Sequence, residues 1–263
     1  MAHERPSERA FKDLVDALND IRPDRRDSID DVQVVVDVGR VARTGVPEIV
    51  LAAGKSIEQL LSACALLLES NGRVVVSRVA ESQVREIERQ FSDCSVTIRP
   101  GSRTALIARR GASVPVSGGR IAMFAAGASD WPAADEARVV AEEMGCEVSL
   151  VVDVGVAGLH RLIRPLRAEL DRGVDAIVVA AGMDGALPSV IAGLVSMPVI
   201  GLPTSTGYGH GGNGEAALMN MLQSCAPGLT VVNIDNGVGA GASAALIANA
   251  AGRFSRQLSD ASS

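Results

Sequence analysis

The sequence has few aromatic residues, few lysines and no long uninterrupted apolar run. Aromatic residues make up 2% of the 263 positions, which leaves few rings on which nucleic-acid bases could stack. The formal net charge is −6, so nonspecific binding of nucleic acid is not expected. The most apolar stretch, residues 175–203, is interrupted by Asp, Gly and Pro, so we do not expect it to span a membrane. Any anionic ligand must be held by local groups, and all basic residues except Lys12 and Lys55 are arginines.

Cysteine and histidine are also scarce. The four cysteines, Cys64, Cys94, Cys146 and Cys225, lie far apart and never form a C-x-x-C pair. This spacing predicts neither a disulfide framework nor a zinc site, and three scattered histidines do not add one. The charged N-terminal residues lack the apolar core of a signal peptide. We therefore expect a cytoplasmic protein with reduced thiols.

The second half of the sequence alternates strand-like and helix-like stretches. Each of five apolar stretches is followed by a turn and a helical pattern, and these stretches begin at residues 120, 146, 174, 197 and 229. Parallel strands need long crossover connections, which helices usually provide. The pattern therefore predicts a doubly wound α/β domain with a parallel sheet.

The first 115 residues lack this alternation and predict a small α/β domain. The expected elements are helices over 7–20, 56–72 and 82–91 and strands over 73–79, 95–100 and 104–110. Residues 111–119, "GASVPVSGG", have the composition of a linker. We therefore expect two domains, at 1–115 and 116–263.

The loops that follow the predicted parallel strands are rich in Gly, Ser, Asp and Asn. Open parallel sheets bind ligands there, beyond the carboxyl ends of the strands. In "GASDWP", Ser129 or Asp130 can cap a helix that has Pro132 in its first turn. Free backbone amides near Gly127 would face a phosphate or a ribose hydroxyl.

Two more loops carry candidate binding residues. His160 and Arg161 begin a helix at the ligand-binding edge, although a solvent-exposed helix face explains them equally well. Residues 207–214, "GYGHGGNG", suit either a flexible lid or an ordinary surface loop, and Tyr208 could stack on a ring. Residues 237–242, "GVGAGA", lack the G-x-G-x-x-G spacing of a dinucleotide fingerprint.

Taken together, these segments resemble the LarB family, the PurE-like enzymes of nickel-pincer cofactor biosynthesis. The resemblance rests on "FAAGASDWPAADEA", "DVGVAGLHRL", "VAAGMDGALPSVIAGLVSMPVIGLPTSTGYG", "LQSCAPG" and "VVNIDNGVGAG", and in the first half on "DVGRVARTGVPEIVLAAGKSIEQL" and "VSRV". It implies a PurE- or flavodoxin-like fold for the C-terminal domain. The sequence is also similar to the carboxyaminoimidazole ribonucleotide mutases of purine synthesis, which lack the N-terminal half and the "SCAPG" cysteine.

The resemblance implies carboxylation of the pyridinium ring of nicotinic acid adenine dinucleotide (NaAD) by carbon dioxide or bicarbonate, with hydrolysis of its phosphoanhydride. The products would be pyridinium-3,5-biscarboxylic acid mononucleotide and AMP, on the route to lactate racemase maturation. Cys225 matches the family's nucleophile, which would form a covalent adduct with the ring. The residue pattern alone instead favours a buried, inert thiol at the end of a helix that starts near Gly214. Asp184 is the candidate for moving the ring proton, where family members commonly carry Glu.

The remaining expectations also come from the resemblance. Arg43 and Lys55 could reach the diphosphate across the domain interface. The loop residues expected to bind substrate are Gly127, Ser129, Asp130, His160, Arg161, Gly182, Met183, Gly185, Tyr208 and Gly209. Mg²⁺ is expected on the diphosphate, with Asp130 and Asp153 as guesses for ligands, and no tightly bound organic cofactor is expected.

The resemblance suggests a homo-octamer. Two other functions stay open at this point. One is a PurE-type aminoimidazole ribonucleotide carboxylase or mutase, which has no use for Cys225. The other is a noncatalytic nucleotide-binding regulator, which would tolerate Cys225→Ala.

Overall fold

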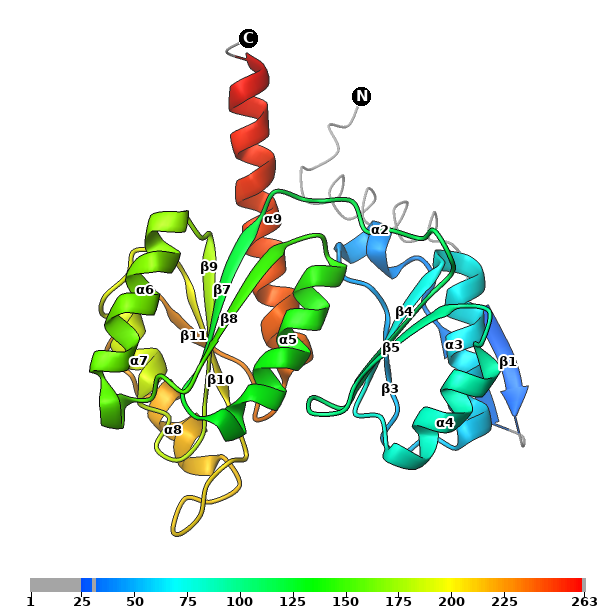
Figure 1. The fold of residues 1–263 in the computed structure, drawn as a ribbon, viewed down its shortest axis with the longest axis horizontal. Coiled ribbons are helices and arrows are strands. Elements are labelled where there is room, and N and C mark those ends of the chain that lie inside the picture. Colours follow the sequence, from blue (N-terminus) through cyan, green and yellow to red (C-terminus); the bar gives the residue numbers. More distant parts are fainter. Residues whose placement is uncertain (1–24, 30–31, 262–263) are drawn as a thin grey trace, which may run out of the picture.

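Two sheets, each with helices packed against it, lie side by side (Figure 1). This arrangement comes from a computed structural model that describes residues 25–29 and 32–261. The helix expected over 7–20 lies outside these residues. Within the described ranges, no helix is both long and apolar enough to cross a membrane.

The larger sheet is parallel throughout. In spatial order its strands are β8 (Glu147–Val152), β7 (Arg120–Ala125), β9 (Ala176–Ala181), β10 (Val199–Pro203) and β11 (Leu229–Val231). Numbered along the chain this is the order 2-1-3-4-5 of flavodoxin-like folds, so the strand order reverses between β7 and β9. The predicted doubly wound fold is confirmed.

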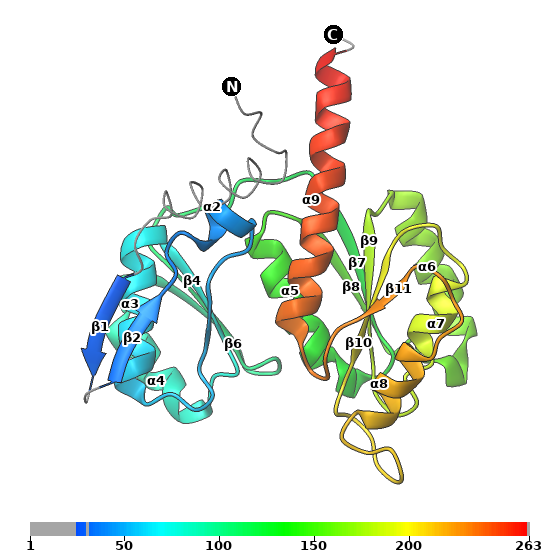
Figure 2. The same ribbon diagram turned by 180° about the vertical axis from the view of Figure 1, so that it is seen from behind.

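Helices cover both faces of this sheet (Figures 1 and 2). They are α5 (Trp131–Glu143) and α9 (Gly237–Ala261) on the face toward the smaller sheet, and α6 (His160–Arg172), α7 (Leu187–Ala192) and α8 (Glu215–Leu222) on the other. The side chains of β7 alternate between the two faces, as those of a strand must. Met123 is buried in the core with α5 and α9, whereas Phe124 is buried in the core with α6, α7 and α8.

The smaller sheet is mixed. Its strands in spatial order are β3 (Ile49–Leu51), β4 (Arg73–Ser77), β6 (Thr104–Ala108) and β5 (Ser95–Arg99). The hairpin β1 (Arg25–Ile29) and β2 (Val32–Val36) forms a separate antiparallel pair. The helices of this part are α2 (Arg40–Thr44), α3 (Ile57–Asn71) and α4 (Glu81–Gln90). The expected helices over 56–72 and 82–91 are present as α3 and α4, whereas β1, β2 and β3 were not predicted.

Helix α3 begins and ends where its sequence indicates. Ser56 Oγ accepts a hydrogen bond from Gln59 N–H (3.3 Å), and Gln59 Oε1 accepts one from Ser56 N–H (3.1 Å), which completes a capping box. Gly72 ends the helix in the left-handed conformation, with φ 73°, which residues with a side chain rarely adopt. Cys64 lies on the buried face beside Leu67, and burial raises its pKa to about 12, so this thiol is a packing residue.

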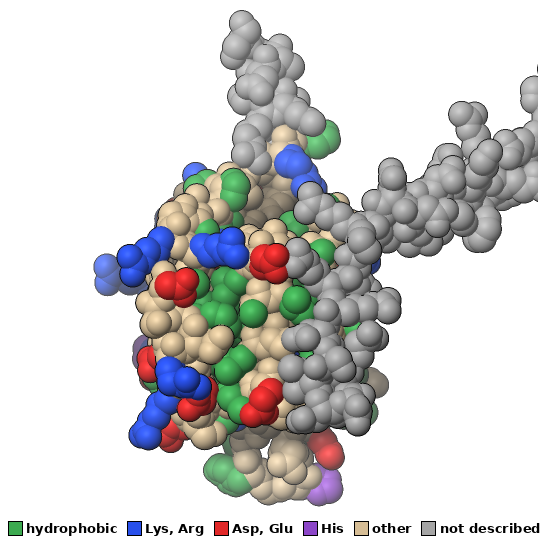
Figure 3. Space-filling view, turned by 90° about the vertical axis from the view of Figure 1, so that its right-hand side faces the viewer, with side chains coloured by type: hydrophobic (Ala, Val, Ile, Leu, Met, Phe, Trp, Pro, Cys, Tyr) green, Lys and Arg blue, Asp and Glu red, His purple; other side chains and the backbone are tan. Residues whose placement is uncertain are grey.

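Helices α3 and α4 cover the face of the smaller sheet that points away from α5 (Figures 1 and 2). On the outer side of this part, Lys and Arg side chains are interspersed with Asp and Glu (Figure 3). Residues 109–119, between β6 and β7, form neither helix nor strand. The domain boundary that we expect after residue 115 lies in this stretch.

A bidentate ion pair joins the two parts of the chain. Arg73, the first residue of β4, donates Nε–H to Glu143 Oε2 (2.8 Å) and an Nη2–H to Glu143 Oε1 (2.5 Å). A further N–H of the same guanidinium goes to the carbonyl of Ala112 (2.8 Å). The side chains of Arg73 and Glu143 are only 21% and 10% exposed. The planar guanidinium fork matches a carboxylate in this geometry and fixes α5 against the smaller sheet.

Two more carboxylates of α5 are buried at the same interface. Asp135 is fully buried and accepts hydrogen bonds from Ser102 Oγ (2.6 Å) and Arg99 Nη1 (3.2 Å). Glu136 is 5% exposed and accepts one from Ser77 Oγ (2.5 Å). Burial raises the pKa of Glu136, and the hydrogen bond from Ser77 opposes this shift. Each of these carboxylates therefore depends on partners from the smaller sheet.

We expect Arg73→Met to lower the free energy of unfolding by about 1.5–3 kcal/mol, because it leaves the mostly buried Glu143 carboxylate without its partner. Arg89→Met is the matched control, since Arg89 and Glu86 form an exposed pair on α4 whose loss should cost about 1 kcal/mol or less. Urea unfolding of both variants measures the difference. Equal losses would contradict a stabilising role for the Arg73 pair.

Glu136→Gln should change how stability depends on pH. Because the pKa of Glu136 is raised in the folded protein, the folded state binds more protons than the unfolded chain between the two pKa values. Stability from this group is therefore present at low pH and is lost as pH rises through the folded pKa. We expect urea unfolding of the variant, followed from about pH 4 to about pH 7, to show a smaller loss with rising pH than the native protein. A larger loss would contradict this account.

Candidate functional site

The larger sheet has a pocket where its strand order reverses, beyond the carboxyl ends of β7 and β9. The loop after β7 forms the short 3-10 helix η1 (Ala128–Asp130), and the loop after β8 forms η2 (Val156–Gly158). The pocket has a volume of about 270 Å³. The lining residues that the sequence had already indicated are Gly127, Ser129, Asp130, Arg161, Gly182, Met183 and Asp184.

Asp130 fixes the floor of this pocket rather than capping α5. Its side chain is 4% exposed, and Oδ2 accepts a hydrogen bond from Gly127 N–H (2.8 Å) while Oδ1 accepts one from Thr204 Oγ1 (2.5 Å). Asp130 stands at the N-cap position of α5 with Pro132 in the first turn, as predicted, but its side chain makes no capping hydrogen bond to this helix. The Gly127 amide is likewise not free for a phosphate, because a buried carboxylate needs the hydrogen bond. Asp130 thus ties the loop after β7 to the end of β10.

Arg161 lies at the rim of the pocket, near the start of α6. Its Nη1 donates to Asp153 Oδ2 (2.7 Å), and both side chains remain partly exposed to solvent. A Cβ at Gly158 would stand 2.6 Å from Arg161 Nε, so a larger residue there would make the guanidinium shift from its present place beside η2. His160 is exposed and does not line the pocket. Of the two basic residues in "GLHR", only Arg161 faces the pocket.

The loop after β9 forms the opposite wall. A Cβ at Gly182 would approach Thr206 O to 2.2 Å, and Met183 N–H donates to that same carbonyl (2.8 Å). The side chain of Asp184 lines the pocket and is exposed, and its backbone carbonyl accepts a hydrogen bond from Asn220 Nδ2 (2.6 Å). The position of the Asp184 carboxylate therefore depends on close contact of this loop with α8 and with the loop after β10.

Three other loop residues predicted from the sequence do not line the pocket. Gly185 is buried with φ 62°, and a Cβ there would lie 2.7 Å from Ala217 Cα in α8. Tyr208 is 83% exposed, and Gly209 is exposed as well. In this structure Gly185 supports the wall, while Tyr208 and Gly209 lie in the exposed loop before α8.

The two basic residues expected from the N-terminal part also lie elsewhere. Arg43 is in α2, where its guanidinium pairs with Asp37. Lys55 is partly buried just before α3 and lines neither the pocket above nor the one between the two sheets. The ion pair with Asp37 accounts for the position of the Arg43 guanidinium.

Arg78 and Arg103, rather than Arg43 and Lys55, lie at the interface between the two parts of the chain. They line a second pocket of about 390 Å³ between the two sheets. This pocket shares Ser129 and Thr206 with the first one, so the two are neighbours. Sequence reasoning missed both arginines, although Arg78 stands inside the quoted motif "VSRV".

Cys225 is exposed, so the interpretation as a buried thiol is wrong. Helix α8 ends at Leu222, so Cys225 does not end this helix as expected but lies three residues beyond it. The thiol precedes the amino end of β11, and it does not line the pocket beyond the carboxyl ends of the strands. The neighbouring Ser224 Oγ accepts a hydrogen bond from Ser189 Oγ in α7 (2.8 Å), which holds this segment against the helix.

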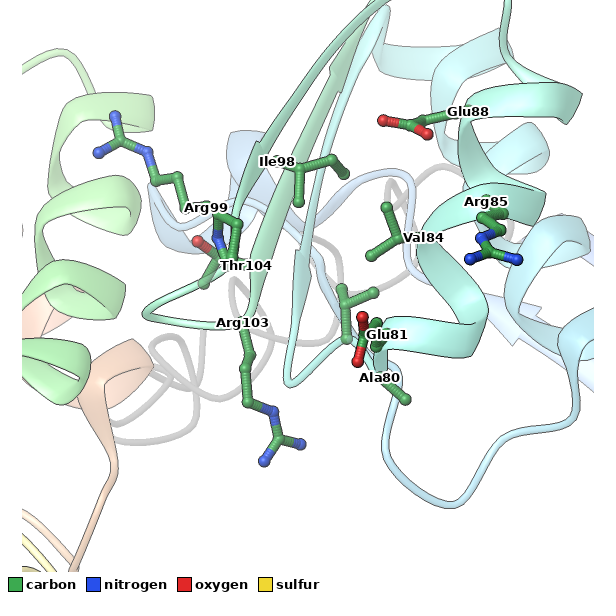
Figure 4. Close-up of a pocket in the computed structure, with 11 residues that line it drawn as sticks. Ala80, Glu81, Val84, Arg85, Glu88, Ile98, Arg99, Arg103 and Thr104 are labelled. Atoms are coloured by element: carbon green, nitrogen blue, oxygen red, sulfur yellow. The ribbon is translucent and has the colours of Figure 1, made fainter.

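A larger cavity of about 800 Å³ lies between α4 and the strands β5 and β6 (Figure 4). Val84 and Ile98 give it apolar walls, with Glu81 and Arg85 on α4. None of the residues predicted from the sequence lines it. Figure 4 also shows Arg103 extending downward from the ends of the strands, and this residue lines both this cavity and the pocket between the two sheets.

The described residues contain no group of three or more His, Cys, Asp or Glu side chains arranged to hold a metal ion. The two carboxylates considered for Mg²⁺ already have partners, because Asp130 bonds to Gly127 and Thr204 and Asp153 pairs with Arg161. These side chains do not fit a preformed magnesium site, and we derive no step through a metal.

Comparison with known proteins covers both parts of the chain. Residues 29–109 match the LarB/PurE-like N-terminal domain, and residues 120–261 match AIR carboxylase. The uncharacterized protein MJ0165 of Methanocaldococcus jannaschii is 43% identical over 216 residues, which are 81% of this chain and 83% of that protein.

Two N5-carboxyaminoimidazole ribonucleotide mutases are similar over a shorter span. The mutase of Thermotoga maritima is 28% identical over 131 residues, 49% of this chain and 74% of its own. The mutase of Pyrococcus abyssi is 32% identical over 120 residues, 46% of this chain and 66% of its own. Since the matches to the N-terminal and carboxylase domains together account for most of the sequence, this chain belongs to the LarB/PurE-like family.

Proposed function

We propose that the protein carboxylates the pyridinium ring of NaAD and hydrolyses its phosphoanhydride, giving pyridinium-3,5-biscarboxylic acid mononucleotide and AMP. The observation that carries this proposal is an exposed thiol, Cys225, in a chain whose residues 29–109 match the LarB/PurE-like N-terminal domain. The mutases of Thermotoga maritima and Pyrococcus abyssi align with only about half of this chain, 49% and 46%. Both features therefore favour a reaction that differs from that of the mutases.

A thiolate has a clear use in this reaction. A pyridinium ring is electron-poor and cannot attack carbon dioxide. Addition of the Cys225 thiolate to the carbon para to nitrogen forms a C–S bond and moves an electron pair onto nitrogen, which gives a neutral dihydropyridine. The neighbouring enamine carbon then forms the new C–C bond to carbon dioxide. Loss of the proton from that carbon and departure of the thiolate restore the aromatic ring.

The first pocket offers groups for the mononucleotide that carries the ring. Arg161 can bind its phosphate at the rim, and Ser129 stands beside it in the loop after β7. Asp184 has an exposed carboxylate on the opposite wall and is our candidate for taking the ring proton. Hydrolysis adds water to a phosphorus of the phosphoanhydride, which breaks the P–O–P bond and releases AMP and the mononucleotide.

Cys225 must reach a pocket that it does not line in its own chain. We propose that the protein works as a homo-octamer and that a neighbouring copy brings Cys225 to the ring. Three apolar side chains on α8 and in the connection after α7 support a contact here. They are more than half exposed, and the last two lie within six residues of Cys225 along the chain: Leu194 (55%), Met219 (58%) and Leu222 (59%).

A mutase acting on an aminoimidazole ribonucleotide is the second candidate. The AIR carboxylase match over residues 120–261 and the position of Cys225 outside the pocket favour it. This reaction has no use for the thiol and releases no AMP. The imidazole nucleotide should therefore be tested beside NaAD.

Cys225→Ser should lower ring carboxylation by about 10³-fold or more, because the dihydropyridine cannot form without the thiolate. The measurement is mass spectrometry of products after incubation with NaAD, bicarbonate and magnesium, together with the mass of the intact protein to detect the adduct. Cys94→Ser, which changes a partly exposed thiol in the N-terminal part, is the matched control. Turnover of the imidazole nucleotide alone, unaffected by Cys225→Ser, would favour the mutase.

A mixture of two variants tests whether neighbouring copies of the protein contribute residues to one site. Cys225→Ser and Asp184→Asn proteins, each with a strongly reduced carboxylation rate alone, should regain part of the activity when they are dissociated and reassembled together. Some sites in the mixture then combine a native Cys225 from one copy with a native Asp184 from another. A mixture with no activity would argue for a thiol that acts within its own chain.

Asp184→Asn should lower the carboxylation rate by roughly 10²–10⁴-fold, because the amide cannot accept the ring proton. Asp184→Glu should retain activity, since the carboxylate is kept at the position where family members commonly carry Glu. Asp171→Asn serves as the control, because Asp171 is an exposed residue of α6 that pairs with Arg167. Steady-state carboxylation rates of the three variants measure this effect. Full activity of Asp184→Asn would show that Asp184 does not take the ring proton.

A further inference from the structure

Arg78 of the N-terminal part contacts the loop before α9. It is the residue after β4, and its Nη2 donates to the backbone carbonyl of Asp235 (3.0 Å). Arg103 in turn donates from Nη2 to the backbone carbonyl of Arg78 (3.4 Å). Burial raises the pKa of Glu136, and the hydrogen bond from Ser77 and the positive charge of Arg78 oppose that shift. Arg78 is therefore attracted to a carboxylate of α5 and bonded to the loop before α9.

Asp235 joins the loop before α9 to the loop after β10. Its Oδ1 accepts a hydrogen bond from Ser205 N–H (2.9 Å), and its own N–H donates to Pro203 O (2.9 Å). Both partners lie within three residues of each other, so this part of the loop after β10 is bonded to Asp235 at two points. The position of the next residue, Thr206, therefore depends on where Asp235 is held.

Thr206 borders both pockets. Its Oγ1 donates to Ser129 O (3.2 Å) in the loop after β7, and its carbonyl accepts a hydrogen bond from Met183 N–H (2.8 Å) in the loop after β9. Met183 directly precedes Asp184, our candidate for taking the ring proton. A continuous series of hydrogen bonds and peptide links thus runs from Arg78 to the wall of the first pocket that carries Asp184.

Four of the residues that these hydrogen bonds join have a left-handed backbone. Arg103 (φ 54°), Arg78 (56°), Asp235 (54°) and Met183 (50°) are four of the six described non-glycine residues with positive φ. Such conformations are costly for residues with a side chain, persist only where the surrounding structure holds them, and cluster at functional sites. The strained residues therefore follow the connection between the N-terminal part and the first pocket.

We propose that Arg78 is a positioning residue, through which the docked N-terminal part keeps the loop after β9, and with it the Asp184 carboxylate, in place. The inference deepens the proposed function and rests on it for the role of Asp184. The N-terminal part then contributes to the reaction without touching the reacting ring. Arg78 lies outside residues 120–261, which match AIR carboxylase, so that domain does not provide this support by itself.

Hydrogen exchange of the full-length protein without substrate tests the placement of these loops. Arg78→Met removes the donor to Asp235 O, so peptides covering residues 203–206 and 182–185 should exchange about tenfold faster or more, because a hydrogen bond from a charged group is lost. Arg78→Lys should keep much of the protection, since an ammonium N–H can bond to the same carbonyl. Unchanged exchange of both loops in Arg78→Met would overturn the proposal.

A control variant separates this effect from docking of the two parts. Arg73→Met breaks the ion pair with Glu143 at the other end of β4 and leaves Arg78 in place. Exchange in the two loops should therefore stay close to that of the native protein. Equal acceleration in Arg73→Met and Arg78→Met would show that Arg78 only holds the two parts together, and would overturn the proposal. Unfolding curves show whether each variant is folded.

Asp235 provides a second pair of variants for the same connection. Asp235→Ala removes the acceptor of Ser205 N–H and should speed exchange in the same two loops. Asp235→Asn keeps an acceptor oxygen and tolerates positive φ, so it should stay close to the native protein. Native exchange of both loops in Asp235→Ala would contradict the connection from Arg78 through Asp235.

Kinetics with NaAD separate positioning from substrate binding. Arg78→Met should lower kcat by about 10- to 10²-fold with little change in KM, because misplacement of a catalytic group slows the chemical step. Arg85→Met is the matched control and should change neither constant, since Arg85 is an exposed arginine of α4 that lines only the cavity beside this helix. A raised KM with native kcat in Arg78→Met would show that Arg78 binds the substrate itself, and would overturn the proposal.

The outcome is separable from that of the proposed function. If NaAD is not carboxylated but both loops exchange faster in Arg78→Met and not in Arg73→Met, the positioning role stands and the reaction is wrong. If NaAD is carboxylated while both loops exchange in Arg78→Met as in the native protein, the reaction stands and the positioning role is wrong.

Discussion

The buried carboxylates of α5 are the constraint on which the rest of the structure depends. Asp135 and Glu136 are nearly inaccessible to water, and a buried charge is tolerated only when it is paired or hydrogen-bonded. Their partners come from the smaller sheet, as does Arg73, which holds Glu143. Because α5 begins directly after the loop that carries Ser129, the same helix docks the N-terminal part and places one wall of both pockets. The second pocket exists only while this docking holds.

The sequence predicted the larger sheet and most of the first pocket because both are encoded locally. Apolar strands alternate with helices, and the residues that end each strand are the residues that a parallel sheet brings together. Ser129, Arg161 and Asp184 were found in this way, from three separate loops. Arg78 and Arg103 were not, since their role depends on which loops of the other part they face. Arg43 was chosen by its motif, but Asp37, six residues away, occupies its guanidinium.

Cys225 shows a second reason why a local sequence pattern can mispredict structure. No glycine or proline stands between Glu215 and Cys225, and the prediction extended the helix to the cysteine and buried its thiol. In the structure α8 stops at Leu222, and the three residues beyond it carry the thiol into an exposed connection. A thiol so close to a helix end would face the negative end of the helix dipole, whereas a thiol in an extended connection is less exposed to it. Because Cys225 precedes the amino end of β11, its thiol does not line the pocket beyond the carboxyl ends of the strands.

The contact between Thr206 and Ser129 separates the two pockets, so ring carboxylation and phosphoanhydride hydrolysis, the two proposed steps, would take place at different positions. A molecule that spans both must pass the contact between Thr206 and Ser129, so the phosphoanhydride that joins its halves would lie there. The ring would lie near Asp184, within the part that matches AIR carboxylase. The mutases act on a ribonucleotide, a single nucleotide, and their similarity is confined to about half of this chain. Arg78 and Arg103 lie outside the residues that match AIR carboxylase, in the part that matches the LarB/PurE-like N-terminal domain.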